Sequence, residues 1–209
     1  MLKIVVVPNK ILTSTVKPVK KIDKKIVELV NQMAKTLDAQ VDPQGVGLAA
    51  PQVGEDLALF IVKKNKKAKL QVFINPKIIK HSNQVKDTIG VASEETLREA
   101  DSARRAESLA EEKQHERQKL SQKKKPPQKL EGCLSIPRIW SPITRSGRIL
   151  LEYQDLAGEV KKQWFGGFDS IIIQHEVDHL RGIMFTQRAL EQNIPLYEEK
   201  DGELEKLKY

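Results

Sequence analysis

Cysteine is almost absent from this chain. Cys133 is the only cysteine among 209 residues, so an intrachain disulfide is impossible and an oxidising compartment is not required. Aromatic residues make up only 5% of the sequence, and no basic stretch is interleaved with them as in proteins that stack on nucleic-acid bases. No segment approaches the roughly 18 apolar residues of a membrane span. The sequence therefore predicts a protein that neither enters a membrane nor acts on DNA.

What the chain does contain is abundant charge and enough apolar residues for one core. Hydrophobic residues make up 39% and charged residues 31%, with a formal net charge of +8. This balance fits one globular domain and favours anionic partners such as RNA. The apolar run near the N-terminus, at residues 4–7, is too short for a secretory signal. The simplest prediction is a cytoplasmic location.

Apolar periodicity predicts the main elements. Residues 22–37 carry apolar side chains at three- and four-residue steps, which is typical of an amphipathic helix. Strands are expected at 57–62, 70–74, 148–153 and 160–165, and Asn75-Pro76 is expected to end the second of them. We predict one catalytic domain over residues 1–190, followed by a polar tail at 191–209 with a turn at Asp201-Gly202.

The sequence HEVDH at residues 175–179 is the most informative motif. His175 and His179 are four residues apart, so on a helix both imidazoles lie on one face and can bind one metal ion. Glu176 lies beside the first ligand, within reach of a water on the metal. The apolar flanks favour a helix within 167–183, with Gly182 as its stop. The alternative is two core histidines that happen to be four residues apart.

Two histidines do not complete a catalytic metal site, which usually has three protein ligands and one position for water. No histidine follows His179, and Glu191 comes too soon after the helix to be a persuasive ligand. Cys133 is the one soft ligand in the chain. A lone cysteine is often just a small core residue, so the residues alone leave both interpretations open.

Three stretches together resemble one family. They are GVGLAAPQ at 45–52, EGCLS at 131–135 and QHEVDH at 174–179, and they closely resemble the three signature motifs of peptide deformylases in the family's order. The resemblance covers most of residues 1–80 and 130–190. It implies an α+β fold in which antiparallel sheets surround a central metal-binding helix. It also implies that Cys133, His175 and His179 are the metal ligands.

The resemblance also implies a reaction. Peptide deformylases hydrolyse the N-formyl group from the N-terminal formyl-methionine of new proteins and release formate. Metal-bound water would attack the formyl carbon, with Glu176 as general base and then general acid. The side-chain amide of Gln52 and the backbone N–H of Leu134 would stabilise the oxyanion. The family typically uses Fe²⁺, and Zn²⁺, Ni²⁺ or Co²⁺ are alternatives for purified protein.

Substrate contacts are predicted on the same basis. An extended peptide is expected to pair its backbone with Val46 and Gly47. The methionine pocket is assigned to Val46, Phe168, Ile171 and Ile172. Glu131 and Arg145 match family positions that hold the site together, although an ordinary surface pair explains them equally well.

The chain departs from the family at about residues 81–129. This charged segment makes the connection about 40 residues longer than in most relatives, and it ends in the basic run KKKPP at 123–127. We consider three interpretations of a helical or disordered insertion: a tolerated surface addition, a transient ribosome contact through RNA, or a lid over the site.

Two other function classes account for parts of the sequence. A metallopeptidase that cuts internal amide bonds would use the histidine helix but leaves Cys133 and Gln52 unexplained. A binding protein with a vestigial site would explain the insertion but not why ligands, base and oxyanion donors occur together.

Overall fold

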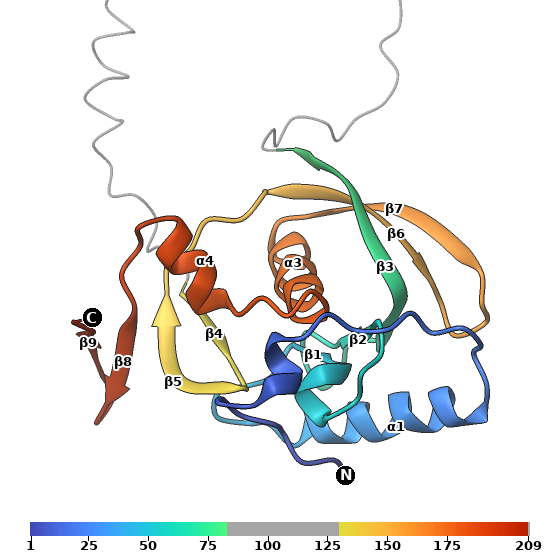
Figure 1. The fold of residues 1–209 in the computed structure, drawn as a ribbon, viewed down its shortest axis with the longest axis horizontal. Helices are drawn as coiled ribbons and strands as arrows, with labels where there is room; N and C mark the ends of the chain where they lie inside the picture. Colours follow the sequence, from blue (N-terminus) through green and yellow to red (C-terminus); the bar gives the residue numbers. More distant parts are fainter. Residues whose placement is uncertain (83–129, 209) are drawn as a thin grey trace, which may run out of the picture. The chain divides into compact units, whose positions relative to one another are not determined.

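The computed structural model describes residues 1–82 and 130–208, which contain two antiparallel sheets and three α-helices (Figure 1). The larger sheet has the strand order β1-β2-β3-β6-β7. Its strands are β1 (Gly47–Ala49), β2 (Leu59–Val62), β3 (Gln71–Ser82), β6 (Arg148–Gln154) and β7 (Val160–Gly166). The smaller sheet has the order β4-β5-β8-β9. Its strands are β4 (Glu131–Cys133), β5 (Ile136–Ser141), β8 (Tyr197–Lys200) and β9 (Glu203–Lys206).

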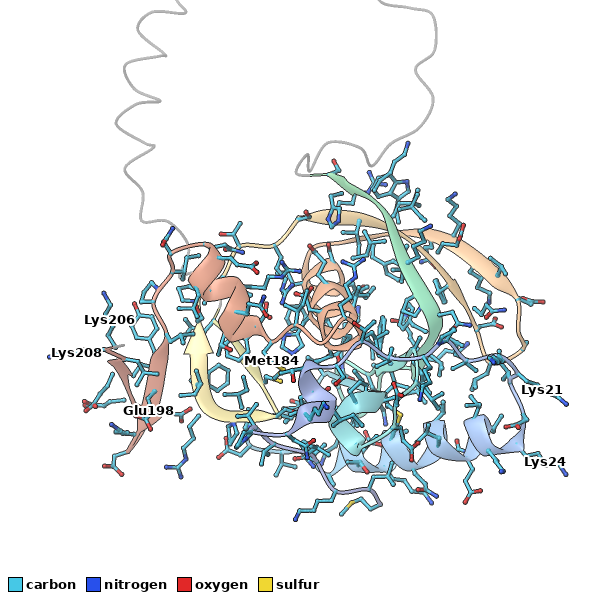
Figure 2. All side chains as sticks on the ribbon, viewed as in Figure 1. Lys21, Lys24, Met184, Glu198, Lys206 and Lys208 are labelled. Carbon is cyan, nitrogen blue, oxygen red and sulfur yellow. The ribbon has the colours of Figure 1, made fainter. Side chains whose placement is uncertain are left out.

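Helix α1 (Lys24–Asp38) confirms the predicted amphipathic helix. The Asp23 side chain caps it by accepting hydrogen bonds from the amides of Lys25 and Ile26, which would otherwise lack partners at the helix start. Its apolar stripe is buried against the larger sheet, while Lys24 points away from the protein (Figure 2). Burial of that stripe positions the segment that leads into β1.

Strand β3 differs from the prediction, because Asn75-Pro76 does not end it. Asn75 adopts a left-handed conformation with φ of 51°, and the pairing of β3 with β6 shifts register between Ile74 and Lys77. A bulge at this point accommodates the missing N–H of Pro76, so the strand continues to Ser82. Residues 81–82, which we assigned to the insertion, therefore belong to β3.

The C-terminal residues also differ from the prediction. Instead of a polar tail, they form the hairpin β8–β9, and β8 pairs with β5 through Tyr197 and Trp140. The expected turn at Asp201-Gly202 joins the two strands. The side chains of Glu198, Lys206 and Lys208 project at this hairpin (Figure 2). Their charge gave no indication of a strand.

Helix α3 (Phe168–Leu180) carries the HEVDH motif and packs against the core of the larger sheet through Ile172, Ile173 and Val177. It ends where predicted. Gly182 has φ of +70°, and a Cβ there would lie 2.6 Å from the backbone of Thr13 in η1 (Lys10–Thr13). Only glycine fits both the conformation and the space. A short helix, α4 (Phe185–Glu191), follows.

Arg138 is a non-glycine residue with φ of 62° on an exposed part of β5. A left-handed conformation costs an L-residue about 1–2 kcal/mol, and glycine loses about 0.5–1 kcal/mol more backbone entropy on folding. Arg138→Gly should therefore raise the free energy of unfolding by about 0.5–1 kcal/mol, measured by urea denaturation. Arg138→Ala, which keeps the Cβ, is the matched control; an equal gain in both variants would contradict the strain argument.

None of the helices in the described parts of the chain has the length and apolar character needed to cross a membrane. The predicted insertion, with its basic run at 123–127, lies outside the described residues apart from the two that belong to β3.

Candidate metal centre

The side chains of Cys133, His175 and His179 lie close together where β4 of the smaller sheet meets α3. Cys133 is the last residue of β4, and the two histidines lie one turn apart on α3. The Cys133 Sγ lies 3.2 Å from His179 Nε2, which lies 3.2 Å from His175 Nε2. All three ligand atoms lie within 4.8 Å of one another. The structure thus brings together the residues that sequence could connect only through a family resemblance.

This donor set fits a divalent metal ion. One sulfur and two imidazole nitrogens are the ligands of borderline-soft ions such as Fe²⁺ and Zn²⁺, and separations of this size are typical of atoms that share one tetrahedral ion. Glu176 provides a second observation. Its Oε2 is buried without a hydrogen-bond partner among the described residues, as expected of an atom that faces a bound water. The residues therefore fit a metal site with an unpartnered carboxylate oxygen beside it.

The surroundings of Cys133 favour the form of its side chain that binds metals. Burial alone would raise the pKa of the Cys133 thiol, but the His179 and His175 imidazoles hold it well below its usual range. Thiolate is the form that binds metals. The His175 ring faces His179 and Cys133 through Nε2, and its other nitrogen, Nδ1, contacts Glu131 Oε1 at 2.5 Å. Burial would lower the pKa of the His175 imidazole, but hydrogen bonds to Cys133 and Glu131 hold it well above its usual range.

Glu131 and Arg145 are not an ordinary surface pair. Their side chains are 10% and 6% exposed, and Arg145 donates to Glu131 through Nη2 at 2.6 Å and Nε at 2.7 Å. Burial would raise the pKa of Glu131, but hydrogen bonds from Arg145 and His175 lower it to about 2. The hydrogen bond to Glu131 fixes the orientation of the His175 ring.

Glu176 is buried beside the ligands and is packed against β1. Burial raises the pKa of its carboxyl to about 7, and the neighbouring imidazoles offset only part of that rise. A Cβ on Gly47 would lie 2.8 Å from the Glu176 Cδ, so only glycine leaves room for the carboxylate. The need for glycine at this position of the 45–52 motif is therefore steric.

Gln52 is held next to the ligands by three hydrogen bonds. It lies in the 3₁₀ helix η2 (Ala50–Val53), where its Oε1 accepts from the Ala49 amide at 2.9 Å. Its Nε2 donates to Ser135 Oγ at 3.2 Å and to Cys133 Sγ at 3.5 Å. These contacts fix its amide N–H groups toward the metal site. Leu134, the other predicted oxyanion donor, directly follows Cys133 in the chain.

The predicted methionine-pocket residues occupy different environments. Ile172 is buried in the core cluster of the larger sheet, and Val46 packs against the same cluster. Ile171 is half-buried, whereas Phe168 is 45% exposed. The structure therefore brings Val46 and Ile172 together and leaves Phe168 at the surface.

Sequence reasoning missed several residues that support the site. Ser135 orients Gln52 by accepting a hydrogen bond from its side chain. Two residues near the N-terminus hold the same pair through the backbone: the amide of Val5 donates to the Gln52 carbonyl, and the amide of Val7 donates to the Ser135 carbonyl. Gln174 binds both backbone groups of Ser146, which anchors α3 beside Arg145. Such contacts join residues far apart in sequence, so no spacing pattern indicates them.

Comparison with known proteins gives a consistent result. The polypeptide deformylase family model matches residues 1–193. The peptide deformylase of Dictyoglomus turgidum is 35% identical over 190 residues, covering 91% of this chain and 93% of the relative. The peptide deformylase of Borreliella burgdorferi is 34% identical over 199 residues, covering 95% and 89% of the two chains.

Solved structures agree with the sequence relatives. The crystal structure of peptide deformylase from Thermotoga maritima superposes with a TM-score of 0.63 at 28% identity, covering 90% of this chain and 97% of that one. The enzyme from Synechococcus elongatus in complex with actinonin gives a TM-score of 0.64 at 26% identity, covering 90% and 79%. With a family model that matches almost the whole chain and relatives above 30% identity, this chain belongs to the polypeptide deformylase family.

Proposed function

We propose that this protein removes the N-formyl group from the formyl-methionyl end of newly made proteins and releases formate. The observation that carries the proposal is the convergence of Cys133, His175 and His179 next to a buried Glu176 with an unpartnered oxygen. Membership of the deformylase family supports the substrate class. A cytoplasmic location is consistent with a site that depends on a reduced Cys133.

The three ligands would hold one divalent ion, which we propose to be Fe²⁺. When bound, such an ion lowers the pKa of a coordinated water toward neutrality and polarises a carbonyl oxygen. Cys133 Sγ lies 3.2 Å from His179 Nε2, and Glu131 holds the ring of His175 through Nδ1. These protein groups fix the ligand geometry before the substrate arrives.

Glu176 is the proposed general base and acid. Its Oε2 has no partner among the described residues and lies on the same turn of α3 as His175, so it can accept a proton from the attacking water. Its pKa of about 7, raised by burial, lets the same carboxyl then protonate the leaving amine of methionine.

Gln52 and Leu134 are the proposed oxyanion donors. The Gln52 amide is fixed by Ala49 and Ser135. Its second N–H, which makes the longer contact to Cys133 Sγ at 3.5 Å, is the one that would turn to the formyl oxygen as negative charge develops there. The Leu134 N–H follows the ligand Cys133 directly. Donors of this kind each contribute about 10²–10³-fold to acyl-transfer rates.

The edge strand β1 is the proposed docking site for the peptide backbone. The Val46 carbonyl accepts from Lys63 N at 2.9 Å, so Val46 faces β2. Because peptide groups alternate along an antiparallel strand, Gly47 presents its own N–H and C=O to the open edge. Gly47 therefore supports the predicted strand addition, whereas the carbonyl of Val46 is already used. For the methionine side chain we propose a pocket formed by Val46, Ile171 and Ile172, with Phe168 at its rim.

Formate release tests the proposed function. Protein purified without oxygen and loaded with Fe²⁺ should release one formate per free amine formed from a formyl-Met tripeptide. The N-acetyl form of the same tripeptide is the matched control, since it adds a methyl group at the carbon that would be attacked. No release from either peptide with Fe²⁺, Ni²⁺ or Zn²⁺ would overturn the proposal, and cleavage at an internal amide would favour a metallopeptidase.

Gly47→Ala tests the contact between β1 and the base. The added Cβ should displace the Glu176 carboxylate, and a misplacement of about 1 Å typically costs about 100-fold in rate, so we expect that loss in kcat/KM. Metal content should not change, because the ligands are untouched. Gly147→Ala is the control, since a Cβ there meets nothing within 4 Å; equal losses in the two variants would refute the steric argument.

A further inference from the structure

Arg188 of helix α4 forms an ion pair with Asp178 of helix α3, which carries His175 and His179. Its Nη2 donates to Asp178 Oδ1 at 2.7 Å and its Nε donates to Asp178 Oδ2 at 3.1 Å. Asp178 is 5% exposed and lies on α3 between the ligands His175 and His179. This two-pronged contact therefore joins α4 to the turn that presents both imidazoles.

Asp178 connects this contact to the residue that holds His175. Its Oδ2 also accepts from Arg145 Nη1 at 2.9 Å, and the same guanidinium grips both oxygens of Glu131. Glu131 in turn bonds to His175 Nδ1. An unbroken series of charged hydrogen bonds thus runs from α4 to the imidazole that faces the metal site.

Charge balance explains why a second arginine is needed. Glu131 and Asp178 are two buried carboxylates, and Arg145 alone carries only one positive charge between them. Arg188 supplies the second. Without it, Asp178 would compete for Arg145, and an undercompensated buried carboxylate is costly. The Arg145 guanidinium would then shift toward Asp178, and its hydrogen bonds to Glu131 would weaken.

We infer that Arg188 is a positioning residue for the metal centre, which fixes the His175 ring through Asp178, Arg145 and Glu131. The inference rests on the proposed ligand set. It makes α4 part of the apparatus that holds the metal, although none of its side chains is a proposed ligand. Because it concerns metal retention, it can be tested independently of deformylation.

The test uses full-length protein loaded with Co²⁺, whose visible spectrum reports ligand geometry. Release of Co²⁺ to a chelator is measured for wild type, Arg188→Met, Arg188→Lys and Glu191→Gln. Loss of an outer-shell partner typically weakens metal binding about 10–100-fold, so we expect about tenfold faster release and a shifted spectrum for Arg188→Met. Arg188→Lys keeps the positive charge but cannot make both hydrogen bonds to Asp178, so its rate of Co²⁺ release should lie between those of wild type and Arg188→Met. It also replaces Arg188→Met in the test if that variant folds poorly.

Glu191→Gln is the matched control. Glu191 accepts from Arg188 Nη1 at 2.9 Å on the exposed side, so its loss leaves the contact with Asp178 intact and should change neither release nor spectrum. Thermal unfolding of the metal-free variants separates an effect on the metal centre from a general loss of stability.

A double-mutant cycle with Glu131→Gln identifies the route. If Arg188 acts through Glu131, Arg188→Met should have little further effect once Glu131 is neutralised. The same fold-change in both backgrounds, or unchanged release in Arg188→Met, would overturn the inference while leaving the ligand set intact. Failure of wild type to bind Co²⁺, or unaltered binding in Cys133→Ala, would instead overturn the ligand set and this inference together.

Discussion

Replacement of Cys133 with Ala should remove the bound metal and reduce formate release to background. Only the two imidazoles would then remain as ligands. Loss of a residue that hydrogen-bonds to a ligand typically lowers metal affinity by up to about 100-fold, and loss of a ligand itself should lower it more. The measurement is metal content per chain by elemental analysis after gel filtration, together with formate release. The two should fall in parallel if the thiolate is a ligand.

The competing interpretation of Cys133 as a small core residue predicts a different result. Its side chain also belongs to the apolar cluster with Ile136 and Met184, so Cys133→Ala would then alter stability slightly and leave metal content unchanged. Thermal unfolding of metal-free protein provides the control. Full metal occupancy in this variant would contradict the ligand set.

Glu176→Gln should lower kcat/KM for formyl-Met peptides by about 10²–10⁴-fold, because the amide cannot accept the proton of the attacking water. The replacement has nearly the same shape, so the close packing against Gly47 is kept. Metal content should remain at the wild-type level. In this respect the variant should differ from Cys133→Ala, which loses both metal and activity.

The comparison of these two variants separates metal binding from proton transfer. Glu176→Asp is a useful third member, since it keeps a carboxyl but withdraws it by one methylene and should retain intermediate activity. Wild-type turnover by Glu176→Gln in metal-loaded protein would show that another group acts as the base, and the mechanism would need revision.

Most of the fold could be predicted where one local pattern dominates. The helix α1 follows from its apolar periodicity and β2 from its continuous apolar run, and β6 and β7 were also expected from the local sequence. The continuation of β3 through Asn75-Pro76 could not be predicted, because it depends on a bulge whose partner strand β6 lies beyond the insertion. Strands β8 and β9 were missed because they are highly charged, and β8 is ordered by pairing with β5 rather than by its own apolar pattern.

The candidate site divides in a similar way. The two histidines and Glu176 are indicated by spacing within one helix, but Cys133 needed a family resemblance, because it lies 42 positions before His175. The steric demand at Gly47 and the contact of Arg188 with Asp178 are purely tertiary. The first joins β1 to α3, and the second joins α4 to α3. No spacing pattern in the sequence indicates either contact.

The pairing of β3 with β6 has a consequence for how the chain reaches its native state. These adjacent strands are joined by the segment that contains the insertion, so the larger sheet cannot be completed until residues beyond it have been synthesised. In the unfolded chain, closing a connection about 40 residues longer costs only about 1 kcal/mol of additional entropy. This entropy cost should appear mainly as slower folding, because the connection must close before β3 and β6 can form their stabilising contacts. Shortening this connection should therefore accelerate refolding.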